Sequence, residues 1–262
     1  MSPNSEKQII LITGATAGIG FDTAVLLASS SPSNHVIMGA RNATKAEAKV
    51  KEVQAKNPKG TVSWIELDVD SDASIEAAAK KLEQDFGRIH ILINNAGVCP
   101  EPASGSPDTS REFLRATFET NVYGPTLLTQ ALLPLIKASK SAKVINVTSG
   151  LGSISMFNAD LDASSVLHYF KDVQGIGYRM SKSALNMLSA WQQYQLRDTA
   201  VKVWAYCPGY VVTDLGGDRE EREKMGLESS ETSAQGILDI VEGKRDAEKG
   251  GFVTKRGGSY PW

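Results

Sequence analysis

Short apolar runs alternate with longer amphipathic stretches along most of this chain. Seven segments have the length of a strand: Ile9–Ile12, Val36–Met38, Thr61–Leu67, Ile89–Ile93, Lys143–Thr148, Val201–Tyr206 and Gly251–Thr254. Among them, Thr61–Leu67 alternates apolar and polar residues. Most stretches between these segments carry apolar residues at helical spacing. Strands that alternate with helices form right-handed βαβ units and a parallel sheet. The pattern therefore predicts an α/β fold: a single doubly wound parallel sheet of about seven strands, flanked by helices.

The same pattern, together with end signals, predicts helices at 21–29, 44–56, 73–86, 110–138, 178–196 and 229–241. Ser71 can cap the third helix, and Gly87 can end it. Thr109 and Glu112 have the spacing of a capping box at the start of the longest helix. Pro125 lies inside that helix, where a proline is unusual.

Length, charge and cysteine content narrow the class of protein. The chain has 262 residues and shows no linker, so we interpret 1–262 as one domain. Its net charge of -2 provides no attraction for nucleic acid or an anionic membrane, and neither is expected as a partner. Cys99 and Cys207 lack metal-ligand spacing, as do the histidines, so no metal is expected. The first residues lack the apolar core of a signal peptide, which favours a cytoplasmic protein.

A glycine-rich turn follows the first predicted strand, at Gly14, Gly18 and Gly20, and a helix follows the turn. Glycines let the backbone approach a pyrophosphate, and the N-terminus of the helix offers N–H groups and the positive end of its dipole. The spacing Gly-x3-Gly-x-Gly differs from the common Gly-x-Gly-x-x-Gly fingerprint. The turn predicts a dinucleotide site; the alternative is a turn whose glycines serve packing alone.

Tyr178 and Lys182 lie four residues apart on a predicted helix, so their side chains share one face. A neighbouring cation favours the phenolate. The spacing therefore predicts a lowered pKa for the Tyr178 hydroxyl and proton exchange near neutral pH. The alternative is a surface tyrosine packed on a lysine stem.

Six segments occur in an order that is typical of one family: Thr13–Gly20, Asn94–Gly97, Asn121, Ser149, Tyr178–Lys182 and Pro208–Thr213. They contain the motifs Thr-Gly-x3-Gly-Ile-Gly, Asn-Asn-Ala-Gly, Tyr-x3-Lys and Pro-Gly-x-Val-x-Thr. Across nearly its whole length the chain resembles the short-chain dehydrogenase/reductase family, and within it the carbonyl reductases. The resemblance implies a Rossmann-type domain and a nicotinamide cofactor.

The resemblance also implies a catalytic tetrad of Ser149, Tyr178, Lys182 and Asn121. In it, Tyr178 exchanges a proton with the carbonyl or alcohol oxygen, and Ser149 hydrogen-bonds the same oxygen. Lys182 holds the nicotinamide ribose, and the backbone carbonyl of Asn121 holds a water that bridges to Lys182. Because Pro125 has no N–H, it cannot occupy the Asn121 carbonyl, so we expect that carbonyl to be free and the helix to bend there.

Further matched positions are implied to bind the cofactor. Asp68 and Val69 correspond to the adenine contacts, and Val211 and Thr213 to the contacts with the nicotinamide carboxamide. The full implied set is Gly14, Thr16, Gly18, Ile19, Gly20, Arg41, Asp68, Val69, Asn95, Ala96, Gly97, Tyr178, Lys182, Pro208, Gly209, Val211 and Thr213.

Arg41 decides which nicotinamide cofactor we expect. NAD-dependent members place an acidic residue after the second strand, where it bonds the ribose 2′-OH. This chain has Ala40 there, followed by Arg41, whose guanidinium suits a 2′-phosphate. We therefore expect NADP(H), and reduction as the cellular direction. The alternative is a solvated charge at a strand end.

Two segments distinguish the chain within the resemblance. Ser149 and Tyr178 lie 29 positions apart, which implies an insertion at about 150–177 of the carbonyl-reductase type. The charged, glycine-bearing segment at about 213–228 is expected to form a substrate lid, with the Glu220–Lys224 charges on its solvated face. The family's tetramer packs the helices that bear Asn121 and Tyr178. Because the insertion can cover that surface, we expect a monomer or homo-oligomer, a dimer being favoured over a tetramer.

These features predict an NADPH-dependent ketoreductase. Its expected substrate is a small to medium carbonyl compound, polyketide-like or aromatic, which it reduces to an alcohol. The alternatives are a non-redox isomerase or cyclase and an NADP-binding protein, both on the same fold. The intact Ser149, Tyr178 and Lys182 favour the reductase, because neither alternative needs all three. The tryptophans Trp64, Trp191 and Trp204 are interpreted as core residues.

Overall fold

The computed structural model describes residues 7–99, 110–159, 175–215 and 219–262. Its central sheet has seven parallel strands in the order β3-β2-β1-β4-β5-β6-β9. The strands are β1 (Gln8–Thr13), β2 (Asn34–Ala40), β3 (Thr61–Glu66), β4 (Ile91–Asn94), β5 (Lys143–Val147), β6 (Lys202–Cys207) and β9 (Phe252–Thr254). Each of the predicted segments contributes one strand, which confirms the doubly wound, Rossmann-type α/β fold.

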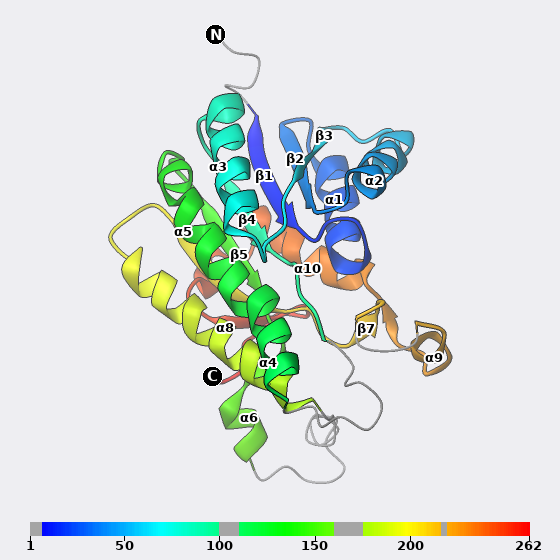
Figure 1. Cartoon of the computed structure of the whole chain (residues 1–262), viewed down its shortest axis with the longest axis vertical. Coiled ribbons are helices and arrows are strands. Elements are labelled where there is room, and N and C mark those ends of the chain that lie inside the picture. Colours follow the sequence, from blue (N-terminus) through cyan, green and yellow to red (C-terminus); the bar gives the residue numbers. More distant parts are fainter. Residues whose placement is uncertain (1–6, 100–109, 160–174, 216–218) are drawn as a thin grey trace.

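Helices cover both faces of the sheet (Figure 1) because alternate strand residues point to opposite sides. Ile10 and Ile12 pack in a core with α1, α2 and α10, whereas Ile9 and Leu11 pack in a second core with α3 and α5. The helices are α1 (Gly18–Ser30), α2 (Ala43–Ala55), α3 (Asp72–Phe86), α4 (Arg111–Phe118), α5 (Gly124–Lys137), α6 (Ile154–Asn158), α8 (Ile176–Gln195), α9 (Arg219–Lys224) and α10 (Glu231–Val241), with short 3-10 turns η2 (Gly150–Gly152) and η3 (Asp246–Glu248).

The predicted ends of α3 are confirmed, whereas the predicted start of α4 is displaced. The Ser71 hydroxyl accepts a hydrogen bond from Ser74 N, and Gly87 ends α3 with a φ of 66°. At α4 the cap is Ser110, whose hydroxyl accepts from Phe113 N at 3.2 Å. Thr109, where the sequence places the cap, lies outside the described residues. The serine takes the role because it can bond the N–H three residues on, as an N-cap does.

The longest predicted helix is not α-helical throughout. A π-helical turn, η1 (Glu119–Tyr123), joins α4 to α5, and the N–H of Gly124 donates to the carbonyl of Glu119. The turn contains Asn121, and Pro125 is the second residue of α5, which begins directly after it. A π-turn inserts one residue into the helical repeat and redirects the side chains around it. The helix therefore departs from regular geometry where Pro125 predicts a bend.

The strand order creates a crevice between β1 and β4. The helix that follows β1, α1, packs on one face of the sheet, and α5, which follows β4 in the chain, packs on the other. Ligands of doubly wound folds bind at such a switch point, beyond the carboxyl ends of the strands. A second, two-stranded sheet of β7 (Val211–Val212) and β8 (Glu228–Ser229), which the sequence pattern does not predict, flanks the expected lid. None of the described helices is both long and apolar enough to cross a membrane.

Candidate active site

A cavity of about 590 Å³ opens at the carboxyl edge of the sheet. It brings together sequence-predicted residues from six separate segments: Gly14, Thr16, Gly18, Ile19, Arg41, Asp68, Val69, Asn95, Ala96, Gly97, Tyr178, Lys182, Pro208 and Thr213. Five other predicted residues do not line it: Gly20, Asn121, Ser149, Gly209 and Val211. The insertion and the lid are described only in part, because residues 160–174 and 216–218 lie outside the described ranges.

Close backbone approach requires the glycines of the β1–α1 turn. The Asn95 amide donates to the carbonyl oxygens of Thr13 at 2.9 Å and Gly14 at 3.3 Å. A Cβ atom at Gly20 would lie only 2.5 Å from the Gly14 carbonyl oxygen, and one at Gly14 would lie 2.9 Å from Ala96 Cα. These glycines therefore hold the ends of β1 and β4 together, so part of their role is packing.

The N-terminus of α1 is arranged for an anion. Helices α2 and α3 begin with side-chain caps from Asn42 and Ser71, whereas the residue before α1 is Ala17, which makes no such bond. Ala17 and Gly18 both line the cavity. The N–H groups of the first helical turn thus face a space where a pyrophosphate would accept their hydrogen bonds and meet the positive end of the dipole. The cradle fits the phosphates of a dinucleotide.

Arg41 lies at the rim of this cavity, directly after β2. It is exposed, and Ala40 before it is buried. Three carboxylates line the same cavity, but all have partners in the protein: Asp214 Oδ1 lies 3.8 Å from Arg219 Nη1. Asp68 Oδ1 accepts from Asp70 N at 3.2 Å, and Asp70 Oδ2 accepts from the Thr120 hydroxyl at 2.9 Å. The position that would carry an acid in an NAD enzyme is therefore apolar, and a guanidinium stands beside it.

Helix α8 places Tyr178 and Lys182 on one face, as predicted. Lys182 Nζ lies 5.5 Å from the centre of the Tyr178 ring and donates to the Val147 carbonyl at 3.0 Å. Ser149 lies two residues beyond the end of β5, and its side chain interacts with the Tyr178 hydroxyl. Ser149 and Lys182 thus lie beside the Tyr178 side chain, and Lys182 is buried, which excludes the alternative of a surface tyrosine resting on a solvated lysine stem.

Burial reverses the direction expected for the Tyr178 pKa. The spacing predicts a lowered value, but burial raises the pKa of the Tyr178 hydroxyl, and the nearby Cys99 and Cys207 thiols raise it further. The hydrogen bond with Ser149 opposes this shift only in part. Burial also lowers the pKa of Lys182 to about 8. The expectation is wrong because the cation is desolvated with the phenol, so Tyr178 is protonated at neutral pH.

The Asn121 side chain connects the β4 loop to α8. Its Oδ1 accepts from Val98 N and its Nδ2 donates to the Val98 carbonyl, both at 2.8 Å. The same Nδ2 donates to the Ser181 hydroxyl at 3.0 Å, one residue before Lys182. Asn121 is fully buried, so these bonds fix the π-turn against the active-site helix. The water-holding role of its backbone carbonyl stays a prediction.

Comparison with known proteins identifies the family. Residues 8–224 match the model of the short chain dehydrogenase family. The chain is 39% identical over 234 residues to the short-chain dehydrogenase anuI of Penicillium roqueforti, covering 88% of this chain and 87% of that protein. It is 36% identical over 267 residues to the short-chain dehydrogenase/reductase eupG of a Phoma species, covering 95% of each. This chain belongs to the short-chain dehydrogenase family.

Among solved structures, this short-chain dehydrogenase is similar to carbonyl reductases. It is similar to the NADPH-bound carbonyl reductase from chicken fatty liver, with a TM-score of 0.81 and 29% identity, covering 98% of this chain and 100% of that one. It is also similar to the carbonyl reductase Sniffer of D. melanogaster, with a TM-score of 0.78 and 26% identity over the same shares. It is thus a carbonyl-reductase-like oxidoreductase, and the glycine cradle fits the nicotinamide cofactor that its family binds.

One arginine of this dehydrogenase is buried although the sequence pattern predicts a solvated position for it. Arg222 lies in α9 within the charge cluster interpreted as a solvated face, yet it is only 7% exposed. Its Nη1 donates to the carbonyl and hydroxyl oxygens of Thr213, and its Nη2 donates to the Leu215 carbonyl. The other residues of the cluster are exposed. No sequence signal distinguishes this one cation within a charged run, because its burial depends on how α9 folds back.

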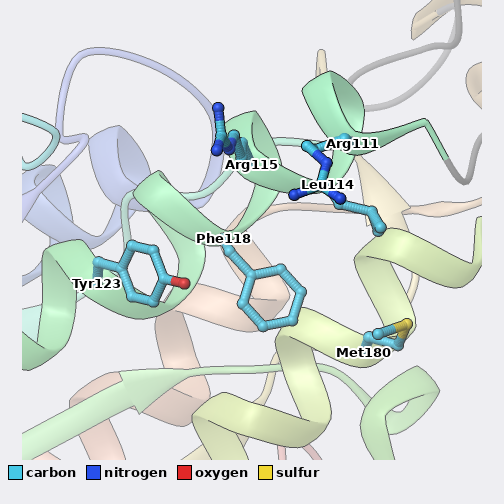
Figure 2. A pocket seen from close by; sticks show the side chains of 6 residues that line it. All are labelled: Arg111, Leu114, Arg115, Phe118, Tyr123 and Met180. Atoms are coloured by element: carbon cyan, nitrogen blue, oxygen red, sulfur yellow. The ribbon is translucent and has the colours of Figure 1, made fainter.

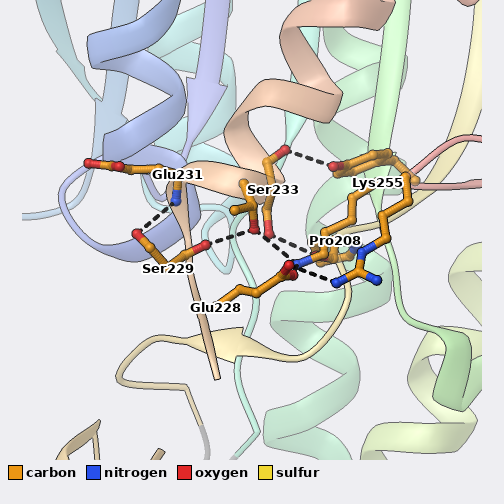
Figure 3. Close-up of polar contacts among 9 residues, drawn as sticks. Pro208, Glu228, Ser229, Glu231, Ser233 and Lys255 are labelled. Carbon is orange, nitrogen blue, oxygen red and sulfur yellow. Dashed lines mark hydrogen bonds and ion pairs between the residues drawn. The ribbon is translucent and has the colours of Figure 1, made fainter. Parts of the chain in front are cut away.

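A polar network holds the loop after β6 (Figure 3). Ser233 of α10 donates its hydroxyl to the Pro208 carbonyl at 2.7 Å. Lys255 pairs with Glu228 of β8 and donates to the Thr232 hydroxyl at 2.9 Å. A Cβ atom at Gly209, whose φ is 76°, would lie 2.9 Å from the Lys255 side chain. The loop that carries the predicted carboxamide contacts is therefore fixed from two sides.

The dehydrogenase also has a hollow outside the predicted site (Figure 2). It measures about 460 Å³ and lies on the outer side of α4 and α8, lined by Arg111, Leu114, Arg115, Phe118, Tyr123 and Met180.

Further along α8, apolar side chains remain exposed. Trp191 is 56% exposed, so its interpretation as a core residue is wrong, whereas Trp204 is fully buried and Trp64 is partly buried against the core. Trp191 is therefore part of an apolar surface on α8 and does not belong to the core.

Proposed function

We propose that this chain is an NADPH-dependent carbonyl reductase that converts a ketone or aldehyde to an alcohol. The observation that carries the proposal is the convergence of Ser149 and Lys182 on Tyr178 at a cavity that also contains an anion cradle. In this family arrangement the phenol supplies the proton for the substrate oxygen. The remaining tetrad member, Asn121, positions α8 through Ser181.

Arg41 supports NADPH as the cofactor, because it places a guanidinium at the cavity directly after Ala40, where an NAD enzyme would carry an acid. The chicken carbonyl reductase to which this chain is similar is itself NADPH-bound. The proposed holding residues are the β1–α1 turn for the phosphates, Asp68 and Val69 for the adenine, and Thr213 for the carboxamide. When bound, NADPH supplies the hydride.

The proton step follows from the two shifted pKa values. Tyr178 is protonated at neutral pH, so its hydroxyl can donate to a substrate oxygen as negative charge develops there. The Ser149 hydroxyl donates a second hydrogen bond to that oxygen. Lys182, whose pKa is about 8, carries its charge at pH 7 and stabilises the phenolate that remains. The Lys182 ammonium then returns a proton to Tyr178 and is itself reprotonated from solvent.

The cavity supports an apolar substrate of small to medium size, aromatic or polyketide-like. Val98, Cys99 and Leu215 line the same cavity as Tyr178 and are uncharged. Of the charged residues in that cavity, Arg41 and Asp68 belong to the proposed cofactor contacts, and Asp214 pairs with Arg219. A pocket with apolar walls and few polar groups orients a carbonyl compound through its one polar atom. We propose that the segment 213–228 closes over this substrate, with α9 held to Thr213 by Arg222.

We further propose that the protein is a homodimer in the cytoplasm. Met187, Trp191 and Tyr194 form a stripe at helical spacing on α8, each more than half exposed. Exposed apolar patches of this kind mark contact surfaces. Two isolated cysteines and a reductive activity suit a reducing compartment.

The test of the proposed function measures NADPH oxidation with a panel of ketones, aldehydes and quinones. We expect turnover by the natural protein and a collapse of turnover in Tyr178→Phe, with NADPH affinity, followed by fluorescence, retained. If Tyr178→Phe still turns over near the natural rate while binding NADPH, the reductase mechanism is wrong. A non-redox isomerase or cyclase on this fold then becomes the leading hypothesis.

A further inference from the structure

The segment 260–262 folds back onto the residues that follow Ser149. The N–H of Tyr260 donates to the Phe252 carbonyl of β9 at 2.8 Å. Beyond it the chain meets the start of α6, where the Ser153 hydroxyl donates to the Pro261 carbonyl at 2.6 Å. The N–H of Ser155 donates to the Trp262 carbonyl at 3.0 Å. Segment 260–262 is thus joined to the beginning of the insertion.

The rings of this segment form a small cluster of their own. The Trp262 ring stacks on Phe252 with ring centres 5.5 Å apart, and the Tyr260 ring meets Phe252 edge-on at 5.6 Å. Phe252 is 1% exposed and packs with Ala205 and Cys207, outside both main cores of the sheet. Aromatic pairs in these arrangements are favourable beyond the area they bury. The cluster therefore fixes segment 260–262 independently of the main cores.

This cluster touches the turn that begins at Ser149. The N–H of Gly150 donates to the Cys207 sulfur at 3.1 Å, and a Cβ atom at Gly150 would lie 3.1 Å from the Tyr260 ring. The Ser149 hydroxyl caps the following 3-10 turn by accepting from Leu151 N at 3.2 Å. A shift of the Tyr260 ring thus leaves a gap directly beside the residue that follows Ser149.

Helix α8 holds the same turn from the opposite side. The Gly152 carbonyl accepts from the Ser183 hydroxyl at 2.9 Å and from the Asn186 amide at 3.2 Å. The elements between these contacts, η2 and α6, have three and five residues. Helical segments this short are not stable by themselves, so their position depends on what packs against them. The Ser149 turn is therefore clamped between α8 and segment 260–262.

We propose that Tyr260 and Trp262 are positioning residues for the carbonyl reduction: they fix the Ser149 turn so that its hydroxyl meets the Tyr178 hydroxyl and the substrate oxygen together. The inference rests on the proposed function. No residue of segment 260–262 lines the cofactor cavity, so its effect falls on the reaction and not on NADPH binding. Catalytic hydrogen bonds are sensitive to displacements of about 1 Å, which can lower rates by about a hundredfold.

The test compares two double variants with the natural protein. Tyr260→Ala with Trp262→Ala removes both rings, and Tyr260→Phe with Trp262→Phe retains two rings. We expect the first to lower kcat by at least about tenfold with NADPH affinity changed less than about twofold, and the second to recover most of the loss. Val50→Ala, in α2 on the far side of the sheet, is the control for lost packing. It should lower Tm with unchanged kcat.

A double-mutant cycle with Ser149→Ala separates positioning from general destabilisation. If the rings act through Ser149, their removal has little further effect on kcat once the hydroxyl is gone. Equal fold losses in the natural and the Ser149→Ala background overturn the proposal, as does an alanine double variant with natural kcat.

Amide hydrogen exchange over residues 149–158 provides a readout that does not depend on activity. We expect faster exchange there in the alanine double variant and natural exchange in the phenylalanine one. If the natural protein reduces no carbonyl compound tested, the proposed function fails, and this measurement alone decides the placement of the Ser149 turn. Unchanged exchange over residues 149–158 in the alanine double variant then overturns the proposal.

Discussion

The Arg222 guanidinium donates to both oxygens of Thr213, to the carbonyl at 3.0 Å and to the hydroxyl at 3.1 Å. Thr213 in turn lies against the glycine turn, where a Cβ atom at Gly18 would be 3.3 Å from its methyl group. Arg222 of α9 thus contacts Thr213, which itself lines the proposed cofactor site. Since the Thr213 oxygen accepts from Arg222, its own hydrogen is available to donate to a ligand.

Removing this guanidinium should weaken both the fold and cofactor binding. In Arg222→Met the carbonyl of the buried Thr213 loses its donor, as does that of the more exposed Leu215, which we expect to lower the free energy of unfolding by about 1–3 kcal/mol. NADPH affinity should fall as well, because Thr213 loses its orientation. The control is Arg219→Met, since Arg219 lies on the same helix but is exposed and its ion pairs contribute little. Denaturant titration and cofactor fluorescence measure the two effects; equal results for both variants would contradict the assignment.

Cofactor preference should depend on Arg41. Arg41→Ala is expected to weaken NADPH binding and leave NADH binding nearly unchanged, because only NADPH carries the 2′-phosphate. A charge-assisted bond of this kind contributes about 1.5–3 kcal/mol, or roughly ten- to a hundredfold in affinity. Lys45→Ala, an exposed change on the neighbouring α2, controls for general charge. Equal losses for both cofactors, or a natural preference for NADH, would show that Arg41 is a solvated charge.

The members of the tetrad should act as a unit. Ser149→Ala removes one donor to the developing alkoxide and should lower kcat on the order of a hundredfold. The double variant with Tyr178→Phe should have a kcat only slightly below that of Tyr178→Phe alone, because both side chains act on one oxygen and one proton. Steady-state kinetics of the two single variants and the double variant test this. Additive losses would mean that Ser149 and Tyr178 serve separate steps.

The lowered pKa of Lys182 implies a stability cost at neutral pH. Burial lowers that pKa from 10.5 to about 8, so between these values the unfolded chain binds a proton that the folded chain does not. The free energy of unfolding therefore rises with pH across this window, and the penalty is fully present below pH 8. It amounts to roughly 3 kcal/mol, partly offset by the bond to Val147.

Lys182→Met removes this penalty. Without cofactor, we expect the variant to be more stable than the natural protein at pH 7 and to lose that advantage between pH 8 and 10.5. Denaturant titrations across this range measure the difference. A variant that is less stable at every pH would show that the lysine is not destabilising. The same variant should lose turnover, because the phenolate then has no neighbouring cation.

The proposed dimer should depend on the α8 stripe. Trp191→Glu places a charge in the centre of that stripe, and we expect it to yield monomers in light scattering after size exclusion. Because Trp191 is 56% exposed in the single chain, the change should not lower Tm through lost core packing. Lys137→Glu on α5, outside the stripe, serves as the charge control. A natural protein that is monomeric at high concentration would contradict the dimer.

The sequence by itself determined the architecture. All seven strands of the sheet lie where the sequence pattern predicts them. The central strands are apolar runs because both faces of the sheet are covered there, whereas the edge strand β3 alternates apolar and polar residues. The ends of α3 follow from Ser71 and Gly87 for equally local reasons. The sequence also predicts the glycine turn and the shared helix face of Tyr178 and Lys182, since each depends on short-range geometry.

Only the tertiary structure decided the electrostatics and supports of the site. The Tyr178 pKa rises because the fold buries the phenol, a property that the spacing to Lys182 does not contain. Arg222 is buried because α9 folds back on Thr213, and Trp191 is exposed because its face of α8 has no partner within the described chain. Tyr260 reaches Gly150 from 110 positions away in the sequence. Desolvation and long-range packing depend on every element at once, which is why local patterns predict the catalytic residues but not what surrounds them.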